Sequence, residues 1–196
     1  MLYKNRDKFS SLSIKIGMAF SRLKITPNAW TVLTLAPAIA ASFFIIKEEF
    51  LAASLFFFLA SFLDLVDGSV ARVTGRVTKK GAYLDTIMDR YVEGIIIISL
   101  FFAVLPGYIF NTGLWLMLFL FGSSMTTYAK AAAKEKLDAE IKGGVAERAE
   151  RLVILFIGLL AGSLDKTYLT YSIVLLAVAS NFTALQRIYI AIKKER

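Results

Sequence analysis

Long apolar stretches separated by short charged or polar segments run through most of the chain. Most are close in length to the roughly 20 apolar residues that a helix needs to cross a hydrocarbon core of about 30 Å. The fifth is the shortest, and we expect it to begin nearer Glu147. The pattern predicts an all-α integral membrane protein with six transmembrane helices. They are expected at Trp30–Ile46, Phe50–Arg72, Ala82–Leu105, Phe110–Lys130, Arg151–Gly162 and Tyr168–Ile192.

The basic residues alternate between the connections of these helices. Of 23 Lys and Arg residues, 20 lie before the first helix, in the second and fourth connections, or at the end of the last helix. The other connections hold Lys47 and Lys166, and Arg90 lies inside a predicted helix. Cytoplasmic loops of membrane proteins carry the excess of Lys and Arg. We therefore expect both termini to face the cytoplasm.

Residues 1–25 precede the first predicted transmembrane helix. Apolar residues such as Phe9, Leu12 and Ile16 are interleaved there with Lys and Ser. This pattern favours an amphipathic helix in the cytoplasmic interface over a solvated tail. The sequence shows no repeat and no low-complexity linker, so residues 1–196 are expected to form a single membrane domain. Residues 26–196 would be its six-helix bundle.

The composition narrows the available chemistry. The chain has 196 residues, of which 57% are hydrophobic, and its formal net charge is +8. Its mean hydropathy is +0.64. It contains no cysteine and no histidine. Disulfides, thiolate metal sites, Cys nucleophiles and a Ser-His-Asp triad are therefore excluded. Acid–base or metal chemistry must come from carboxylates.

Two pairs of acids interrupt the second and third apolar stretches. Asp64 and Asp67 are three residues apart, and Asp85 and Asp89 are four apart, so each pair shares one helix face. A charge at the bilayer centre costs at least about 2.5–3.5 kcal/mol, so such residues face the bundle interior or a water-filled cavity. Counted along the helices, both pairs lie roughly a turn or two inside the cytoplasmic boundary. We expect them to form one shared site.

Four carboxylates in one site repel one another strongly, by about 4 kcal/mol for a pair 4 Å apart at an effective dielectric constant of 20. Protonation would relieve part of this repulsion, and divalent cations would relieve more of it. Oxygen-only ligands suit Mg²⁺, Mn²⁺ or Ca²⁺, and two bridged metals would suit phosphoryl transfer. The small residues Gly68, Ala71 and Gly81 lie beside the acids. They indicate either close helix packing or room for a ligand.

These residues together resemble a known signature. The string Asp64-x2-Asp67-Gly68-x2-Ala71-Arg72-x8-Gly81-x3-Asp85-x3-Asp89 is similar to that of the CDP-alcohol phosphotransferases. The resemblance implies an enzyme that moves a phosphatidyl unit from a CDP-linked donor to an acceptor hydroxyl and releases CMP. It implies two divalent cations, Mg²⁺ or Mn²⁺, held by Asp64, Asp67 and Asp85 and completed by Asp89. Asp89 would also be the catalytic base.

The resemblance also implies residues that bind the two substrates. Donor binding would involve Asn28, Asp64, Gly68, Ala71, Arg72 and Gly81. A second set resembles the branch that accepts inositol phosphates, the phosphatidylinositol-phosphate and archaetidylinositol-phosphate synthases. In that branch a hydroxyl, a lysine and two arginines bind the acceptor phosphate. The corresponding residues here are Thr127, Lys130, Arg151 and Arg187.

The expected reaction is therefore phospholipid synthesis at the cell membrane, in a multi-pass protein whose active site opens to the cytoplasm. The favoured acceptor is myo-inositol 1-phosphate, and the alternative is glycerol 3-phosphate. The buried acids by themselves are also compatible with a protein of a different class, a divalent-cation or proton-coupled transporter. A structural scaffold would leave those acids unexplained. The expected partners are the CDP-activated lipid, the phosphorylated alcohol, membrane lipid and a second copy in a homodimer, with no nucleic acid.

Overall fold

The computed structural model describes residues 6–141 and 143–195. The first five residues of the predicted interfacial segment lie outside this range. So do three of the basic residues counted above, Lys4, Lys142 and Arg196.

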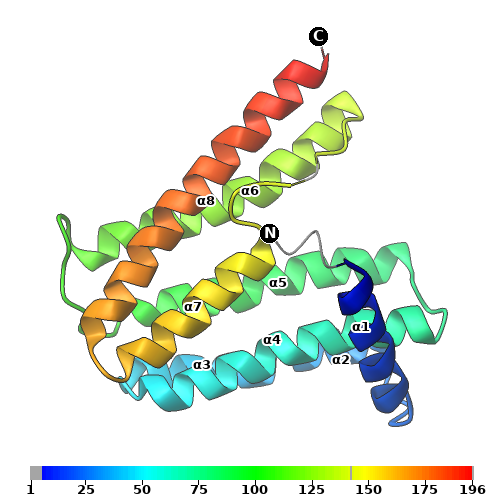
Figure 1. The fold of residues 1–196 in the computed structure, drawn as a ribbon, viewed down its shortest axis with the longest axis horizontal. Coiled ribbons are helices and arrows are strands. Elements are labelled where there is room, and N and C mark those ends of the chain that lie inside the picture. The colour runs from blue at the N-terminus through cyan, green and yellow to red at the C-terminus, as the bar shows by residue number, and fades with distance from the viewer. Residues whose placement is uncertain (1–5, 142, 196) are drawn as a thin grey trace. The chain divides into compact units, whose positions relative to one another are not determined.

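Helices make up most of the described chain, and no strand is present within it (Figure 1). Three helical stretches are long and apolar enough to cross a membrane, at Pro27–Ile46, Phe50–Val73 and Lys166–Lys194. The prediction of an all-α membrane protein is confirmed at this level. The helices in chain order are α1 (Arg6–Ser21), α2 (Pro27–Leu33), α3 (Leu35–Ile46), α4 (Phe50–Val73), α5 (Lys79–Leu100), α6 (Thr112–Leu137), α7 (Arg148–Gly162) and α8 (Lys166–Glu195).

The first predicted transmembrane helix is divided into α2 and α3 at Thr34. Thr26 caps the start of α2, where its hydroxyl accepts a hydrogen bond from the backbone N–H of Ala29 at 3.3 Å. The division has a local cause in Pro37. Proline has no N–H to offer the carbonyl four residues earlier, and its ring presses against that carbonyl. The regular helix is therefore interrupted just after Leu33.

Two helices end away from their predicted positions. The third was expected to reach Leu105, but α5 ends at Leu100, and three successive turn hydrogen bonds follow at residues 101–103. Pro106 disfavours helix in the residue before it, which explains the early end. The fourth was expected to end at Lys130, but α6 continues to Leu137. The added residues are mostly Ala, Lys and Glu, which are strong helix formers.

The chain divides into two compact units. Unit 1 comprises Met1–Ser42 and Leu55–Ile96. Its described core has one cluster around Trp30, Val66 and Val70, and a second around Ala38, Ala60 and Val92. The first cluster joins α2 to the middle of α4, so it holds the acid-bearing part of α4 against the start of the predicted bundle.

Unit 2 comprises Phe43–Ser54 and Ile97–Arg196. Within it α6 and α8 lie side by side, and α7 packs on α8 (Figure 1). The α6–α8 contact is close because Gly122 has no side chain. A Cβ there would come within 2.6 Å of Asn181 Nδ2. The Asn181 amide in turn donates to the Leu118 carbonyl at 2.8 Å.

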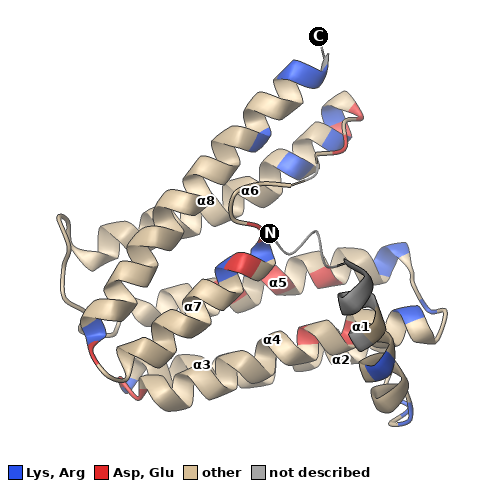
Figure 2. Ribbon diagram, in the orientation of Figure 1, with Lys and Arg blue, Asp and Glu red and all other residues tan. Residues whose placement is uncertain are grey.

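The same two helices carry basic residues near their C-terminal ends, at Lys134 and Lys136 on α6 and at Lys193 and Lys194 on α8 (Figure 2). At the other end of unit 2, Glu48 joins three loops. Its carboxylate accepts from the backbone N–H of Val104 at 2.7 Å and pairs with the Lys166 ammonium. The hydrogen bond from Lys166, with that from Val104, holds the pKa of Glu48 below its ordinary value.

Candidate functional site

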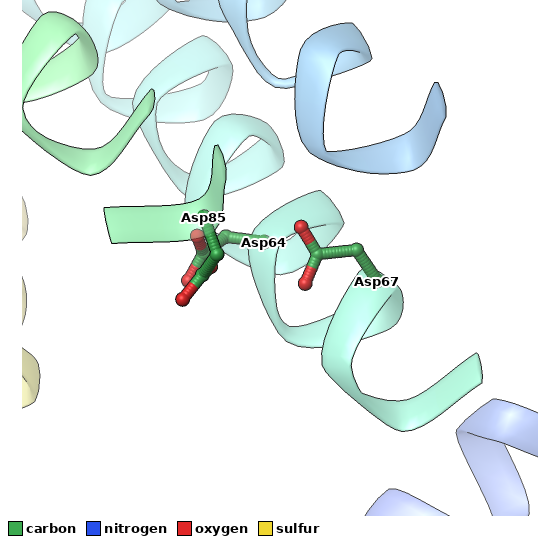
Figure 3. Close-up of side chains that lie close together, drawn as sticks. All are labelled: Asp64, Asp67 and Asp85. Carbon is green, nitrogen blue, oxygen red and sulfur yellow. The ribbon is translucent and has the colours of Figure 1, made fainter. Parts of the chain in front are cut away.

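Three of the four predicted acids converge in unit 1. Asp64 and Asp67 project from one face of α4, and Asp85 projects from the second turn of α5 (Figure 3). Each offers one carboxylate oxygen, and these oxygens all lie within 4.8 Å of one another. The i,i+3 spacing on α4 and the close approach of α5 produce this group, which we call the acid cluster.

Asp67 is the most enclosed member of the acid cluster. It is only 5% exposed, whereas Asp64 and Asp85 are half-buried. Its Oδ2 is buried and has no hydrogen-bond partner among the described residues. A buried carboxylate oxygen without a donor is costly unless a cation or proton satisfies it. Oxygen ligands at this separation fit a hard divalent cation, so the residues present suit the metal that the sequence predicts.

Asp89 lies one turn further along α5 than Asp85, and its side chain is half-buried. It is not among the three residues of the acid cluster. Further along this helix, Arg90 and Glu93 form an ion pair. The four acids of the prediction thus occur as a group of three with Asp89 one helical turn from Asp85.

The predicted donor-binding residues form two pairs in unit 1. Gly81 lies in the first turn of α5, and a Cβ there would lie 3.1 Å from Asn28 Oδ1. Gly68 lies beside Arg72, and a Cβ there would lie 3.3 Å from Arg72 Nη1. Ala71, the remaining member, is half-buried on α4. At both positions the absence of a side chain therefore lets a polar side chain approach the helix backbone closely.

The predicted acceptor-binding arginines meet at one residue of unit 2. Arg151 is 3% exposed, and its Nη1 donates to Thr126 Oγ1 at 3.4 Å and to the Ala146 carbonyl at 3.2 Å. Arg187 Nη1 donates to the Thr126 carbonyl at 2.8 Å, and its Nε donates to the Gly143 carbonyl at 3.2 Å. We call Arg151, Arg187 and Thr126 the arginine cluster.

The other two predicted acceptor residues lie on α6 next to this cluster in sequence. Thr127 is half-buried and Lys130 is exposed. Thr126, which contacts both arginines, was not predicted. The available signal was its position, four residues before Lys130 on the same helix face.

The loop before α7 is held by side chains that the sequence left unassigned. Thr183 Oγ1 accepts from the backbone N–H of Ala146 at 3.0 Å. Glu150 accepts from the backbone N–H of Glu147 at 3.1 Å, which is one half of a capping box. Glu147 and Glu150 therefore shape the start of α7, the helix that carries Arg151.

Comparison with known proteins gives a consistent result. Residues 24–186 match the CDP-alcohol phosphatidyltransferase family. The chain is 33% identical to the archaetidylinositol phosphate synthase of Pyrococcus horikoshii, over 99% of this chain and 98% of that one.

Solved structures agree with this result. The phosphatidylinositol phosphate synthase of Mycobacterium tuberculosis, in complex with manganese and citrate, aligns with a TM-score of 0.81 and 26% identity, over 92% of this chain and 88% of that one. The same enzyme with CDP-DAG bound aligns with a TM-score of 0.78 and 26% identity, over 92% of this chain and 94% of that one.

Proposed function

Because the chain belongs to the CDP-alcohol phosphatidyltransferase family, we propose that it joins a CDP-activated lipid to an inositol phosphate and releases CMP. The transferred unit is phosphatidyl or archaetidyl. The relative from Pyrococcus horikoshii is named for the archaetidylinositol phosphate product, and the M. tuberculosis enzyme binds CDP-DAG. Within the molecule, the convergence of Asp64, Asp67 and Asp85 carries the proposal. Family membership favours this transferase over a transporter.

The acid cluster is assigned to divalent metal, Mg²⁺ or Mn²⁺. Asp64, Asp67 and Asp85 would hold it, and Asp89 would complete the ligands of a pair of ions. When bound, such cations neutralise the donor diphosphate and stabilise the charge that develops on the departing CMP. The orphaned Oδ2 of Asp67 and the manganese in the related structure both support this assignment.

Asp89 is assigned as the base. Its carboxylate would accept the proton of the acceptor hydroxyl as that oxygen forms a bond to the lipid-bearing phosphorus and the bond from this phosphorus to CMP breaks. The chain has no histidine, so a carboxylate takes this role. Asp89→Asn keeps the shape of the side chain but cannot take the proton. We expect turnover to fall at least about a hundredfold while CDP-lipid binding persists, and near-normal turnover would exclude Asp89 as the base.

The substrate-binding residues follow from the two pairs in unit 1 and from the arginine cluster. Asn28, Gly68, Ala71, Arg72 and Gly81, with Asp64, would bind the CDP part of the donor. Arg151 and Arg187, with Thr127 and Lys130, would bind the acceptor phosphate. Arginine captures phosphate through paired N–H donors, which suits a phosphorylated acceptor better than a neutral one. Both arginines already have fixed positions through Thr126.

The membrane arrangement is part of the same proposal. It comprises one domain with six transmembrane segments, the three apolar stretches named above together with α5, α6 and α7. Both termini face the cytoplasm, the active site opens there, and two copies form a homodimer. The distribution of Lys and Arg along the sequence supports this orientation. Accessibility labelling of single cysteines introduced into this cysteine-free chain would test it at each loop.

The decisive experiment follows CMP release by the purified protein in lipid nanodiscs. CDP-diacylglycerol and its ether-linked archaeal counterpart are offered with Mn²⁺ or Mg²⁺ and one acceptor at a time. The acceptors are myo-inositol 1-phosphate, glycerol 3-phosphate and myo-inositol. We expect release with myo-inositol 1-phosphate and none with unphosphorylated inositol. Release with glycerol 3-phosphate alone would replace the acceptor, and no metal-dependent release with any acceptor would contradict the proposal.

A further inference from the structure

The N-terminal helix α1 is seated directly on the part of α4 that carries the signature residues. Gly17 makes the closest approach. A Cβ at this position would lie 2.5 Å from the Ser69 carbonyl oxygen and 2.7 Å from a methyl group of Val73. One turn later, the Phe20 ring meets those of Trp30 and Phe62 edge-on, at centroid distances of 5.6 and 5.7 Å. The helix is therefore fixed in position and register on α4.

At this contact a chain of hydrogen bonds links α1 to Arg72. Arg72 Nη2 donates to Ser13 Oγ at 2.7 Å and to Ser69 Oγ at 3.3 Å. The two serine hydroxyls lie 2.8 Å apart. Ser69 donates its single proton to the Leu65 carbonyl at 2.7 Å. Since a hydroxyl has only one proton, Ser13 must donate to Ser69 while it accepts from Arg72.

These hydrogen bonds fix the edge of the Arg72 guanidinium that faces the protein. Nη2 faces the two serines, and Nη1 packs over Gly68, where a Cβ would lie 3.3 Å from it. A guanidinium presents its N–H donors in a rigid planar fork, so fixing one edge fixes the direction of the others. Without Ser13, the guanidinium of this exposed residue would keep only the longer bond to Ser69.

We propose that α1 is part of the donor site and that Ser13 is a positioning residue, which holds the Arg72 guanidinium beside Gly68 for the CDP group of the lipid donor. The inference rests on the proposed function, because that proposal gives Arg72 its part in donor binding. It adds a residue outside the eight-residue signature, 51 positions before the first member of the acid cluster in sequence.

The outward face of α1 fits this role. Ile14 and Met18, one turn apart, are 49% and 51% exposed, and the neighbouring Lys15 is exposed as well. An apolar face bordered by a lysine is typical of a helix at the surface of a bilayer. The CDP group of a lipid-anchored donor lies in the same interface. A helix at this depth can therefore contact both the membrane surface and the donor.

A double-mutant cycle tests the inference with CDP-diacylglycerol as the donor. We expect Ser13→Ala to raise the KM for the donor about five-fold, through loss of one hydrogen bond to a charged group, with kcat and the acceptor KM unchanged. In an Arg72→Ala background, Ser13→Ala should have no further effect. Ser13→Thr restores the hydroxyl and should return the donor KM towards normal. Ser11→Ala, on the exposed side of α1, is the matched control and should change nothing.

Gly17→Ala provides a second test, because its methyl group would meet backbone atoms of α4 and push α1 away. It should raise the donor KM at least as much as Ser13→Ala. The inference would be overturned if the increases in donor KM from Ser13→Ala and Arg72→Ala multiplied in the double variant. Equal changes in the donor and acceptor KM would also overturn it. Failure of the proposed function is recognised separately, because the wild-type protein would then release no CMP.

Discussion

The acid cluster and the arginine cluster differ in the hydrogen-bond partners that the described chain gives their charged side chains. In the acid cluster, Asp67 is almost completely buried, yet its Oδ2 has no partner within the described chain. In the arginine cluster, Arg187 donates to two backbone carbonyls, and Arg151 donates to a carbonyl and a hydroxyl. Each arginine thus has at least two oxygen acceptors in the described chain, whereas Asp67 Oδ2 has no donor there.

This difference bears on the metal and phosphate roles proposed for the two clusters. A buried carboxylate oxygen without a protein donor gains most from an external cation, which fits the metal role proposed for the acid cluster. An arginine held by carbonyls loses little conformational freedom on binding, so the arginine cluster is organised before its ligand arrives. The first should be strained without metal, and the second should be ordered without substrate.

Asp67→Asn gives the largest effect expected from this comparison. Loss of a metal ligand should lower CMP release at least about a hundredfold. The same change removes the charge of a buried carboxylate whose Oδ2 has no donor, so the variant should unfold at a higher temperature than the wild type in EDTA. Manganese should raise the unfolding temperature of the wild type only. Asp138→Asn, at the exposed residue that caps the C-terminal end of α6, is the control. If Asp67→Asn is less stable than the wild type in EDTA, the acid cluster is not strained.

Arg187→Ala should have the next largest effect. Loss of a charged phosphate contact should raise the KM for the phosphorylated acceptor about ten- to a hundredfold and leave the donor KM nearly unchanged. Arg187→Lys keeps the charge but not the paired donors, so its effect should be intermediate. Lys193→Ala, exposed on the same helix, serves as the control. Equal increases in both KM values would mean that the arginine cluster only supports the fold.

Glu48 extends the comparison, because its carboxylate accepts hydrogen bonds from other residues of the chain. Its pKa is lowered by the hydrogen bond from Lys166 and by that from the Val104 N–H. A lowered folded-state pKa stabilises the protein at pH values above the ordinary value of 4.5, and this contribution is lost as the pH falls through the folded pKa. Glu48→Gln should therefore lower the unfolding temperature at pH 7. We expect this to be the smallest of the three effects.

The matched control for this measurement is Glu49→Gln, since Glu49 is the exposed neighbour. The difference between Glu48→Gln and the wild type should narrow as the pH falls below 4.5. A difference that does not change with pH would show that the charge of Glu48 contributes nothing.

Hydrophobic periodicity and length predicted the helices because a membrane requires long apolar stretches whatever their packing. They did not predict the break at Thr34, since the apolar pattern continues through it and only the backbone of Pro37 interrupts the helix. The early end of α5 has a related cause in Pro106. The extension of α6 depends on the helix propensity of residues 131–137, which a hydropathy pattern does not register.

The candidate site was predictable where spacing alone determines proximity. The i,i+3 pair on α4 had to share a face, and Asp85 joins it from α5. Asp89, one turn further along α5 than Asp85, is not in that group. Thr126 was missed because one of its links to the arginines is a backbone carbonyl, which every residue has. Ser13 was missed because its contact joins residues 59 positions apart.

The length of α8 also limits how this sequence can vary. Its 30 residues span about 45 Å, which exceeds a hydrocarbon core of about 30 Å. Arg187 lies about 32 Å from the start of the helix, and its register determines whether the guanidinium meets Gly143. One inserted residue before it would turn the side chain by about 100° and move it by about 1.5 Å. An insertion or deletion in α8 before Arg187 should therefore disrupt the arginine cluster.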